Sequence, residues 1–324
     1  MVDVKGEVMM DKELEDILQK NPWQPLADAL RNALSKGQDW KSIPMYAKDD
    51  EKHVADLNLK FRRGGGRRAK KRYWSCQLRY EYPPIPFIGT PEADVWLLLM
   101  NPGFSPLDYY NFIDREEGCR RMVDRELKEK TVPTEWLKRD DVDRFARRRD
   151  LYAKSLDFSI VEPSQQFYVL DECMDTIEQV GKKLNGGYNW YGRNLFKGWQ
   201  DEGGNLNDSA AFFKASNQAE RLRIASSRIF DLEFAPYHSI NFTKPEDYTE
   251  FAHTQFWESL VKYALTHGKK LIVRGCNLLK LVESVDVEAF HLAVEERRIL
   301  RFVSSQNVSL SYRNLVDEHP ARVL

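Results

Sequence analysis

One apolar run, Val95 to Met100, most constrains how this chain can fold. The run is unbroken and has the length of a strand, which is typical of a central strand covered on both faces. Asn101, Pro102 and Gly103 follow, and the strand is expected to end there because proline cannot continue a sheet ladder and glycine frees the backbone. Asn101 is then presented at the carboxyl end of the strand, where open α/β sheets bind ligands. Taken alone, Asn-Pro-Gly more often marks an ordinary turn.

Strands and helices alternate regularly in the last third of the chain. Strands are predicted over Ile229–Ala235, Lys270–Arg274 and Ile299–Val303, with helices over Tyr248–His267 and Asn277–Ser284 between them. Strands separated by helices indicate a parallel sheet with helices on both faces. We therefore predict an α/β fold with a central, mainly parallel sheet.

The remaining segments read as additions to that sheet. Residues 1–59 carry an acidic excess and two predicted helices, Lys12–Gln19 and Pro25–Ser35. A strand is predicted over Gln77–Tyr82, and a helix is expected to begin at Ser311. The middle of the chain is predicted to hold an irregular aromatic-rich loop, Asn185–Asn207, and charge-rich helices over Cys119–Lys130, Thr134–Tyr152, Gln165–Leu184 and Ala210–Ser227.

Composition excludes several classes of protein. A mean hydropathy of -0.59, the lack of a long apolar stretch and an acidic start predict a cytoplasmic chain without membrane contact. The 4 cysteines are scattered without a C-x-x-C pair, which argues against a zinc site and a disulfide framework, and their spacing does not favour an iron-sulfur cluster. GxGxxG, Walker A, HExxH and GxSxG motifs are absent. We expect no metal, no cofactor and no obligatory protein partner.

The segment Lys60–Tyr73 is strongly basic and rich in glycine, although the net charge of the whole chain is only -1. It holds 8 basic residues around 3 glycines with no acid among them. Such a segment repels itself too strongly to be packed inside, and its natural partner is a polyanion such as the phosphate backbone of DNA. A solvated loop is the simpler alternative, but aromatic residues next to basic ones favour nucleic acid. The predicted contacts are Arg62, Arg63, Arg67, Arg68, Lys70, Lys71 and Arg72.

Three polar loops leave the carboxyl ends of predicted core strands. They are Asn101–Gly103, Glu233–Ser239 and Ser304–Ser311. With these loops the sequence resembles the uracil-DNA glycosylase superfamily, chiefly its single-strand-selective and mismatch-specific branches. The run from Leu99 to Gly103 is similar to that family's Gly-x-Asn-Pro-Gly, with Leu99 in place of the first glycine. The run from Asn307 to Arg313 is similar to its last motif, with one residue fewer and no proline.

The resemblance covers residues from about Asp94 to Arg313, and it implies a fold and roles for single residues. The implied fold is a three-layer α/β/α domain over residues 74–324 with a helical insertion at about 113–227, preceded by an accessory segment, 1–73. The implied activity is that of a DNA glycosylase, with Asn101, Asn307 and Ser309 as catalytic residues and Arg313 as a DNA contact. Glu233 takes the place of the family's asparagine that reads uracil.

Chemistry supports such roles independently of the family. Hydrolysis of an N-glycosidic bond passes through an oxocarbenium-like sugar, so an amide such as Asn101 can position the attacking water. Asn307, Ser309 or backbone N–H groups of the same loop can donate to the departing base. An extruded base can stack on Tyr109, Tyr110 or Phe112, with simple packing of these rings in the loop as the equal alternative. His238 is a candidate for base recognition, although a lone histidine beside proline and tyrosine is more often structural.

Glu233 directs the prediction of the substrate. An ionised glutamate only accepts hydrogen bonds, so it suits the N4 amino group of cytosine better than the O4 of uracil. Ordinary cytosine cannot be the target, which points to a cytosine with a C5 substituent, as in some phage genomes. The resemblance to the superfamily then implies a defence enzyme that acts on invading DNA. A protonated Glu233 donates to O4 instead and leaves uracil in base-excision repair as the alternative. A non-catalytic DNA-binding protein of this fold is also compatible with the sequence, whereas the basic segment disfavours a hydrolase of free nucleosides.

Overall fold

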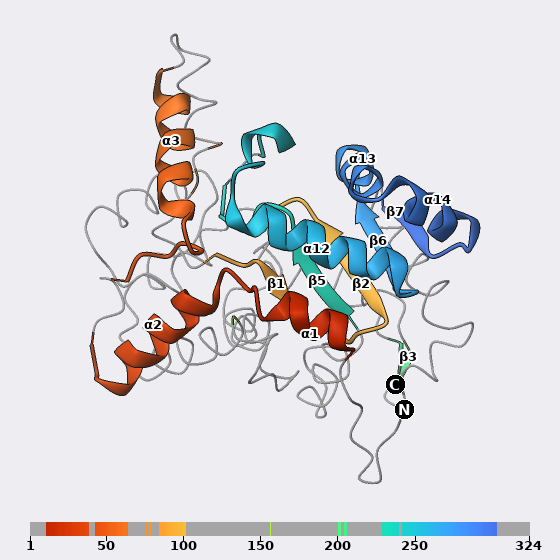
Figure 1. Cartoon of the computed structure of the whole chain (residues 1–324), viewed down its shortest axis with the longest axis horizontal. Helices are drawn as coiled ribbons and strands as arrows, with labels where there is room; N and C mark the ends of the chain where they lie inside the picture. Colours follow the sequence, from red (N-terminus) through yellow and green to blue (C-terminus); the bar gives the residue numbers. More distant parts are fainter. Residues whose placement is uncertain are drawn as a thin grey trace.

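The computed structural model describes residues 11–38, 43–63, 76, 78, 84–101, 156, 200–201, 204–205, 229–239 and 242–302. Over these ranges the chain is a mixed α/β fold, with a 5-stranded, mostly parallel sheet flanked by helices (Figure 1). The four parallel strands are β2 (Val95–Leu99), β5 (Ile229–Glu233), β6 (Lys270–Arg274) and β7 (Ile299–Phe302). All four lie where the sequence predicted strands.

Strand β2 lies inside the sheet, between β5 and β6. The chain passes from β2 to β5 on one side and then crosses to β6 and β7 on the other, so the spatial order is β5-β2-β6-β7. Such a reversal is a topological switch point, and ligands of open α/β sheets bind outside the carboxyl ends of the strands there. Asn101 follows β2 at this edge.

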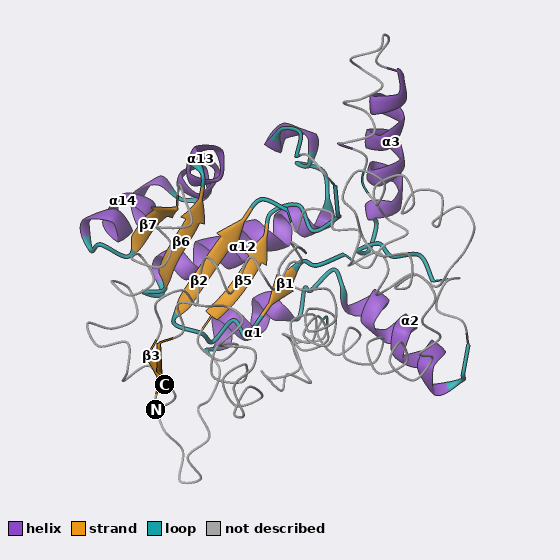
Figure 2. Cartoon of the chain, turned by 180° about the vertical axis from the view of Figure 1, so that it is seen from behind, coloured by secondary structure: helices purple, strands orange, loops and turns teal. Residues whose placement is uncertain are grey.

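The two faces of the sheet differ in chemistry. Side chains alternate along a strand, and Trp96 and Leu98 of β2 join the hydrophobic core beneath helix α12 (Ala252–Thr266). Figure 2 views the sheet from the other side, with α12 behind it. On that other face β5 carries Asp231 and Glu233, which are 1% and 3% exposed. Two acids are thus buried side by side on one strand.

Strand β1 (Phe87–Ile88) pairs antiparallel with β5 and was not predicted. It is too short for a periodic signal, and its pairing is prolonged by hydrogen bonds from the Glu233 N–H to the Pro86 carbonyl, 2.9 Å, and from the Ile85 N–H to the Pro236 carbonyl, 3.0 Å. Gly89 makes the approach possible, because with φ at 98° a Cβ there would lie 2.0 Å from the Ile229 carbonyl oxygen.

The helices of the last third pack on the α12 face. Helix α13 (Cys276–Val285) matches the prediction, and α12 begins later than expected, after the 3-10 turn η5 (Pro245–Asp247). Helix α14 (Val287–Glu295) was not predicted, and the Asp286 carboxylate begins it by accepting the Ala289 N–H at 3.1 Å. Leu278 of α13 and Phe290 of α14 belong to the same core as α12.

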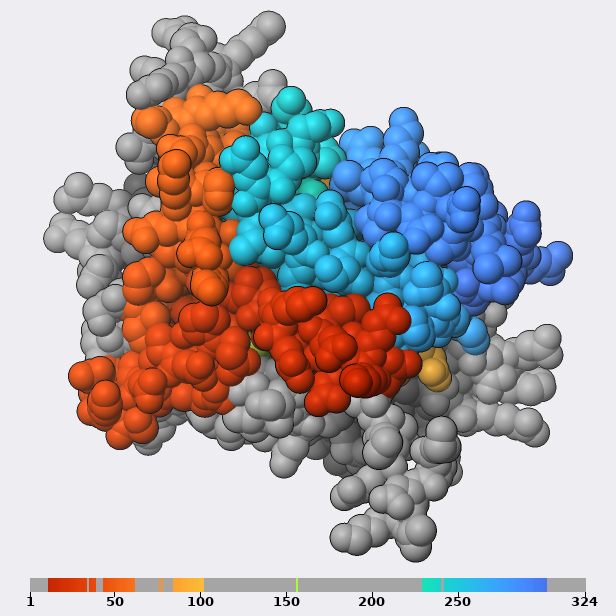
Figure 3. Space-filling view, viewed as in Figure 1, coloured from red at the N-terminus to blue at the C-terminus, as the bar shows by residue number. Residues whose placement is uncertain are grey.

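The N-terminal helices share this core. Helices α1 (Lys12–Leu18) and α2 (Gln24–Ser35) confirm the two predicted there, whereas α3 (Asp50–Arg63) is additional. Its last turn contains the first four residues of the basic segment, and Lys60 Nζ forms an ion pair with Asp247 Oδ1 at 2.6 Å. Figure 3 shows these helices, red to orange, packed directly against the cyan and blue residues of the C-terminal third.

Two buried polar contacts join this N-terminal part to the sheet. The Trp23 indole N–H donates to His253 Nδ1 at 2.9 Å, so the other ring nitrogen carries the proton and donates to the Glu233 carbonyl at 2.7 Å. Asp50, the first residue of α3, accepts the Ala252 N–H at 2.7 Å and the Tyr237 hydroxyl at 2.8 Å. Burial lowers the pKa of His253 to about 4 and raises the pKa of Asp50 to about 6.

Several predicted elements fall outside the described residues. They are the helices at 119–130, 134–152, 165–184 and 210–227 and the helix expected from Ser311. Of the predicted strand Gln77–Tyr82 only Leu78 is described, and it is not in a strand; its backbone is bound at both N–H and carbonyl by the Asn58 side chain. Inside the predicted irregular loop, β3 (Gln200–Asp201) and β4 (Gly204–Asn205) form a short antiparallel pair.

The opposite pKa shifts of Asp50 and His253 predict opposing effects of pH on stability. A carboxyl with a raised pKa in the folded state stabilises fully below its unfolded pKa of about 3.9, and this contribution is lost as pH rises through about 6. A histidine with a lowered pKa stabilises fully above about 6.5, and this contribution is lost as pH falls through about 4. Each effect is on the order of 3 kcal/mol, so the two largely cancel in the wild type between pH 4 and 6.

We expect single variants to reveal each effect. Relative to wild type, the free energy of unfolding of Asp50→Asn should rise with pH over this window, and that of His253→Gln should fall. Urea unfolding at several pH values between 4 and 7.5 measures both, with Asp16→Asn, which removes an exposed carboxyl, as the control. If the free energy of unfolding of all three variants changes with pH in parallel with that of wild type, neither buried group titrates as described.

Candidate functional site

The site begins with the amide of Asn101, which is half-buried just after β2. Its side-chain nitrogen donates to the carbonyl oxygen of Ser239 at 3.1 Å and to the Ser239 hydroxyl oxygen at 3.3 Å. A backbone carbonyl can only accept, so these contacts fix which end of the amide faces Ser239. The Asn101 carbonyl oxygen is therefore turned away from Ser239 and is oriented as an acceptor.

The loop Glu233–Ser239 lies next to Asn101 because pairing continues beyond the strands. The Phe234 N–H donates to the Leu99 carbonyl and the Ala235 N–H to the Met100 carbonyl, both at 2.9 Å. These bonds continue the parallel register in which Leu99 faces Glu233. Two of the three loops predicted from the sequence are thus brought together at the carboxyl edge.

Glu233 is the most unusual side chain at this edge. It is 3% exposed, and its Oε2 has no hydrogen-bond partner among the described residues. Burial raises the pKa of the Glu233 carboxyl well above its ordinary value, repulsion from Asp231 raises it further, and Arg274 opposes the shift. The neutral acid is therefore favoured, and unlike a carboxylate it both donates and accepts hydrogen bonds.

Arg274 and Asp231 are residues that the sequence reasoning missed. Arg274 ends β6, which is separated from β5 by β2, so the Arg274 and Glu233 backbones lie about 10 Å apart across the sheet. It brings positive charge to the carboxyl edge, and Gly275 after it adopts φ 86°, at the start of α13. Considering the end of every predicted parallel strand would have found Arg274, and the acid spacing in the run from Phe230 to Glu233 would have found Asp231.

Two buried histidines lie in or beside the loop, His238 within it and His253 on α12. His238 is fully buried within the loop, and its role in base recognition stays a prediction. His253 is fully buried on α12, and its two ring nitrogens bind Trp23 and the Glu233 carbonyl. Its lowered pKa keeps it neutral and structural at pH 7. No pattern in the sequence signals this role, because both partners lie far away along the chain.

The remaining predicted site residues lie outside the described residues. They are Asn307, Ser309, Tyr110, Phe112, Arg67, Arg68, Lys70, Lys71, Arg72 and Arg313. Arg62 and Arg63 occupy the last turn of α3, where only their backbone is described. Their roles therefore stay predictions. Of the predicted constellation, the structure describes Asn101 just after β2, Glu233 at the end of β5 and His238 in the loop that follows β5.

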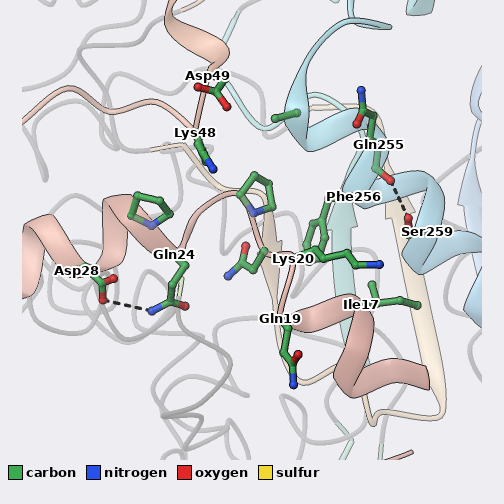
Figure 4. A pocket seen from close by; sticks show the side chains of 14 residues that line it. Ile17, Gln19, Lys20, Gln24, Asp28, Lys48, Asp49, Gln255, Phe256 and Ser259 are labelled. Atoms are coloured by element: carbon green, nitrogen blue, oxygen red, sulfur yellow. Dashed lines mark hydrogen bonds between the residues drawn. The ribbon is translucent and has the colours of Figure 1, made fainter. Parts of the chain in front are cut away.

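An open cavity of about 580 Å³ lies elsewhere, between α1, α2 and α12 (Figure 4). Its lining is mixed: it includes Lys20 and Lys48, acids, side-chain amides and the ring of Phe256. None of Asn101, Glu233 or His238 lines it. The cavity is therefore separate from the polar groups at the carboxyl edge of the sheet, which lie at the ends of β2, β5 and β6.

Metal sites, membrane spans and relatives add few constraints. Among the described residues, no three His, Cys, Asp or Glu side chains gather as a metal site. No helix within the described ranges is both long and apolar enough to cross a membrane. Comparison with known proteins found no matching family model, no matching curated protein and no matching solved structure. DNA as the partner and a cytoplasmic location therefore stay predictions.

Proposed function

We propose that this chain is a monofunctional DNA glycosylase that hydrolyses the N-glycosidic bond of a non-canonical pyrimidine and leaves an abasic site, in the three-layer α/β/α fold that the resemblance implies. One observation carries the proposal. Asn101 is fixed by Ser239 at the carboxyl end of the central strand, with Glu233 buried one strand away. The reversal of strand order at β2 supports a ligand site at that edge.

Asn101 positions the attacking water in this proposal. The transition state is an oxocarbenium-like sugar, which water attacks on one face while the base leaves on the other. A carbonyl oxygen is too weakly basic to remove a proton early, but it can accept a hydrogen bond from the water and orient it. Ser239 supplies the rigidity, because two contacts to the amide nitrogen prevent the amide from rotating.

The departing base needs donors for its developing negative charge. The predicted donors in the final loop, Asn307 and Ser309, fulfil this role in the proposal. With uracil as the target, a neutral Glu233 at the end of β5 adds a hydroxyl donor, and burial favours that protonation state. The basic segment that begins in α3 holds the DNA by its phosphates, and the target base is flipped out of the stack.

Two bases fit Glu233, in different protonation states. An ionised Glu233 accepts from the N4 amino group of cytosine, and selectivity for a substituent on C5 would direct the enzyme to modified cytosines of invading phage DNA. This is our first candidate. The raised pKa of Glu233 favours a second, since a neutral carboxyl donates to O4 and accepts from N3–H of uracil, as an amide does.

Activity itself is the first test. The purified protein should create abasic sites in DNA that contains the target base, seen as alkali-dependent strand breaks, and EDTA should not abolish them because amides and a carboxyl carry out the reaction. Asn101→Ala should lower the rate about 100-fold or more. Asn32→Ala, the same change at an exposed position of α2, should not. Full activity in a folded Asn101→Ala would remove the water-positioning role.

The base is identified by parallel digestion of uracil-containing, unmodified and C5-modified-cytosine DNA. Release of the modified cytosine, abolished in Glu233→Gln, is the expected outcome, because the substitution removes the negative charge and replaces one of the two acceptor oxygens by an NH₂ donor. Release of uracil alone, retained in Glu233→Gln, would instead assign the second candidate. Binding to all three DNAs without any release would favour a non-catalytic DNA-binding protein.

Affinity should depend on the basic segment in a salt-dependent way. Replacing Arg62, Arg63, Arg67 and Arg68 with Gln should weaken binding to every sequence, and the slope of log affinity against log salt should fall by about 0.7–0.9 for each phosphate that is no longer neutralised. The charge-matched control replaces four exposed lysines elsewhere: Lys12, Lys36, Lys52 and Lys280. Equal salt slopes for both quadruple variants would place DNA away from the segment.

A further inference from the structure

A buried carboxylate outside the site is bound to the loop that holds Asn101. Asp50 is 0% exposed at the start of α3. One of its oxygens accepts the Ala252 N–H at 2.7 Å, and the other accepts the Tyr237 hydroxyl at 2.8 Å. The Tyr237 hydroxyl oxygen in turn accepts the Ala47 N–H at 3.0 Å. A single side chain thus joins α3, the first turn of α12 and the loop Glu233–Ser239.

Tyr237 stands two residues before Ser239, the partner of Asn101. Both residues are fully buried, and the Tyr237 ring lies against Trp23 and Phe251 at centroid distances of 5.7 and 5.9 Å. The path from Asp50 to the Asn101 amide therefore runs through one side chain, two residues of backbone and one pair of hydrogen bonds. A shift of Tyr237 must be passed on to Ser239 or absorbed within two residues.

The same loop is held at its other end. The His253 ring donates to the Glu233 carbonyl at 2.7 Å, and the first loop amides bind the end of β2. At the far end, where Ser239 meets Asn101, the Tyr237 hydroxyl connects the loop to Asp50. Rigidity at that end matters because the Asn101 amide takes its orientation from Ser239 alone among the described residues.

We propose that Asp50 is a positioning residue for the site, acting through Tyr237 and Ser239 on the amide of Asn101. A carboxylate suits this position because its two oxygens serve two donors at once. In an asparagine one of these two oxygens is replaced by an NH₂ group, which only donates, so either the Ala252 N–H or the Tyr237 hydroxyl loses the acceptor that it now contacts. The Tyr237 oxygen already accepts from Ala47, so its own proton needs the second carboxylate oxygen. The assignment of a catalytic effect rests on the proposed glycosylase function.

The surroundings of Asp50 define how its protonation affects the site. The charged or titratable groups that face it are Tyr237 from the loop, His53 from α3 and the adjacent Asp49. His53 Nδ1 lies 3.5 Å from Oε2 of Glu250, which comes two residues before α12. Protonation of the Asp50 carboxylate removes one of its acceptor oxygens, as the substitution Asp50→Asn does. The acid limb of the wild-type rate should therefore include a step near pH 6.

The test compares Asp50→Asn and Tyr237→Phe with wild type in steady-state base release. Both variants should lower kcat about 10-fold or more and change KM for DNA less than about 2-fold, because neither residue is a predicted DNA contact. The rate of both variants should also lack the step near pH 6. The asparagine in Asp50→Asn cannot titrate, and in Tyr237→Phe the hydroxyl that connects Asp50 to the loop is missing. The control is Asp286→Asn, which removes a helix-capping carboxylate at α14 and should leave kcat unchanged.

Hydrogen exchange separates this proposal from the proposed function. Peptides that cover residues 233–239 and 94–101 should exchange faster in both variants at pH 7, and those of β6 and α13 should not. This readout applies even if wild type releases no base, an outcome that would remove the glycosylase proposal alone. Unchanged exchange and unchanged kcat, or a pH step retained in Asp50→Asn, would overturn the positioning role. Tyr237→Phe deletes one oxygen and keeps the test decisive if Asp50→Asn does not fold.

Discussion

The pairing of β5 with β2 beyond the ends of both strands is the interaction on which the candidate site depends. Hydrogen bonds from Phe234 and Ala235 to the carbonyls of Leu99 and Met100 keep the two chains side by side until Asn101 is reached. Without them, Ser239 would not meet the Asn101 amide, and Glu233 would not lie beside the end of β2. The loop is also bound by Pro86 and Ile85 on its other side, so it behaves as part of the sheet. A site built on such a loop is more rigid than one on an ordinary connection.

Burial of polar groups from the N-terminal part supports that loop from behind. His253 stays neutral and Asp50 holds its charge with difficulty, and each shift reflects desolvation more than any neighbouring charge. Groups of this kind destabilise a protein when left without partners, but here each oxygen or nitrogen has a defined contact. The helices α1 to α3 are consequently more than a cover for α12, because Trp23 and Asp50 reach the backbone and side chains of the loop.

More of the sheet than of the contacts around the candidate site could be predicted from the sequence. The parallel strands were found because apolar runs such as Val95–Leu99 are buried on both faces and need no partner to be recognised. Strand β1 was missed because two residues carry no period, and α3 because the basic segment concealed its amphipathic pattern. Asn101 and Glu233 were found from their places at strand ends. His253 and Asp50 were not, since each acts through contacts with residues 20 to 230 positions away. Long-range polar contacts leave no local signal.

In its neutral form, the Glu233 carboxyl can offer the same hydrogen-bonding groups as the asparagine that it replaces in the proposed chemistry. An asparagine at the family's reading position offers one donor and one acceptor, and an ionised glutamate offers only acceptors. Burial and the nearby Asp231 both hold the proton on Glu233, and the neutral acid again offers one donor and one acceptor. Under the proposed function, the surroundings of Glu233 therefore determine whether it binds a base as an amide would or as a carboxylate would. Arg274 acts in the opposite direction, since positive charge favours the carboxylate. In the proposed function, burial and Asp231 on β5 favour the neutral acid, whereas Arg274 on β6 favours the carboxylate, so the choice of base depends on the sheet around Glu233 as much as on the residue itself.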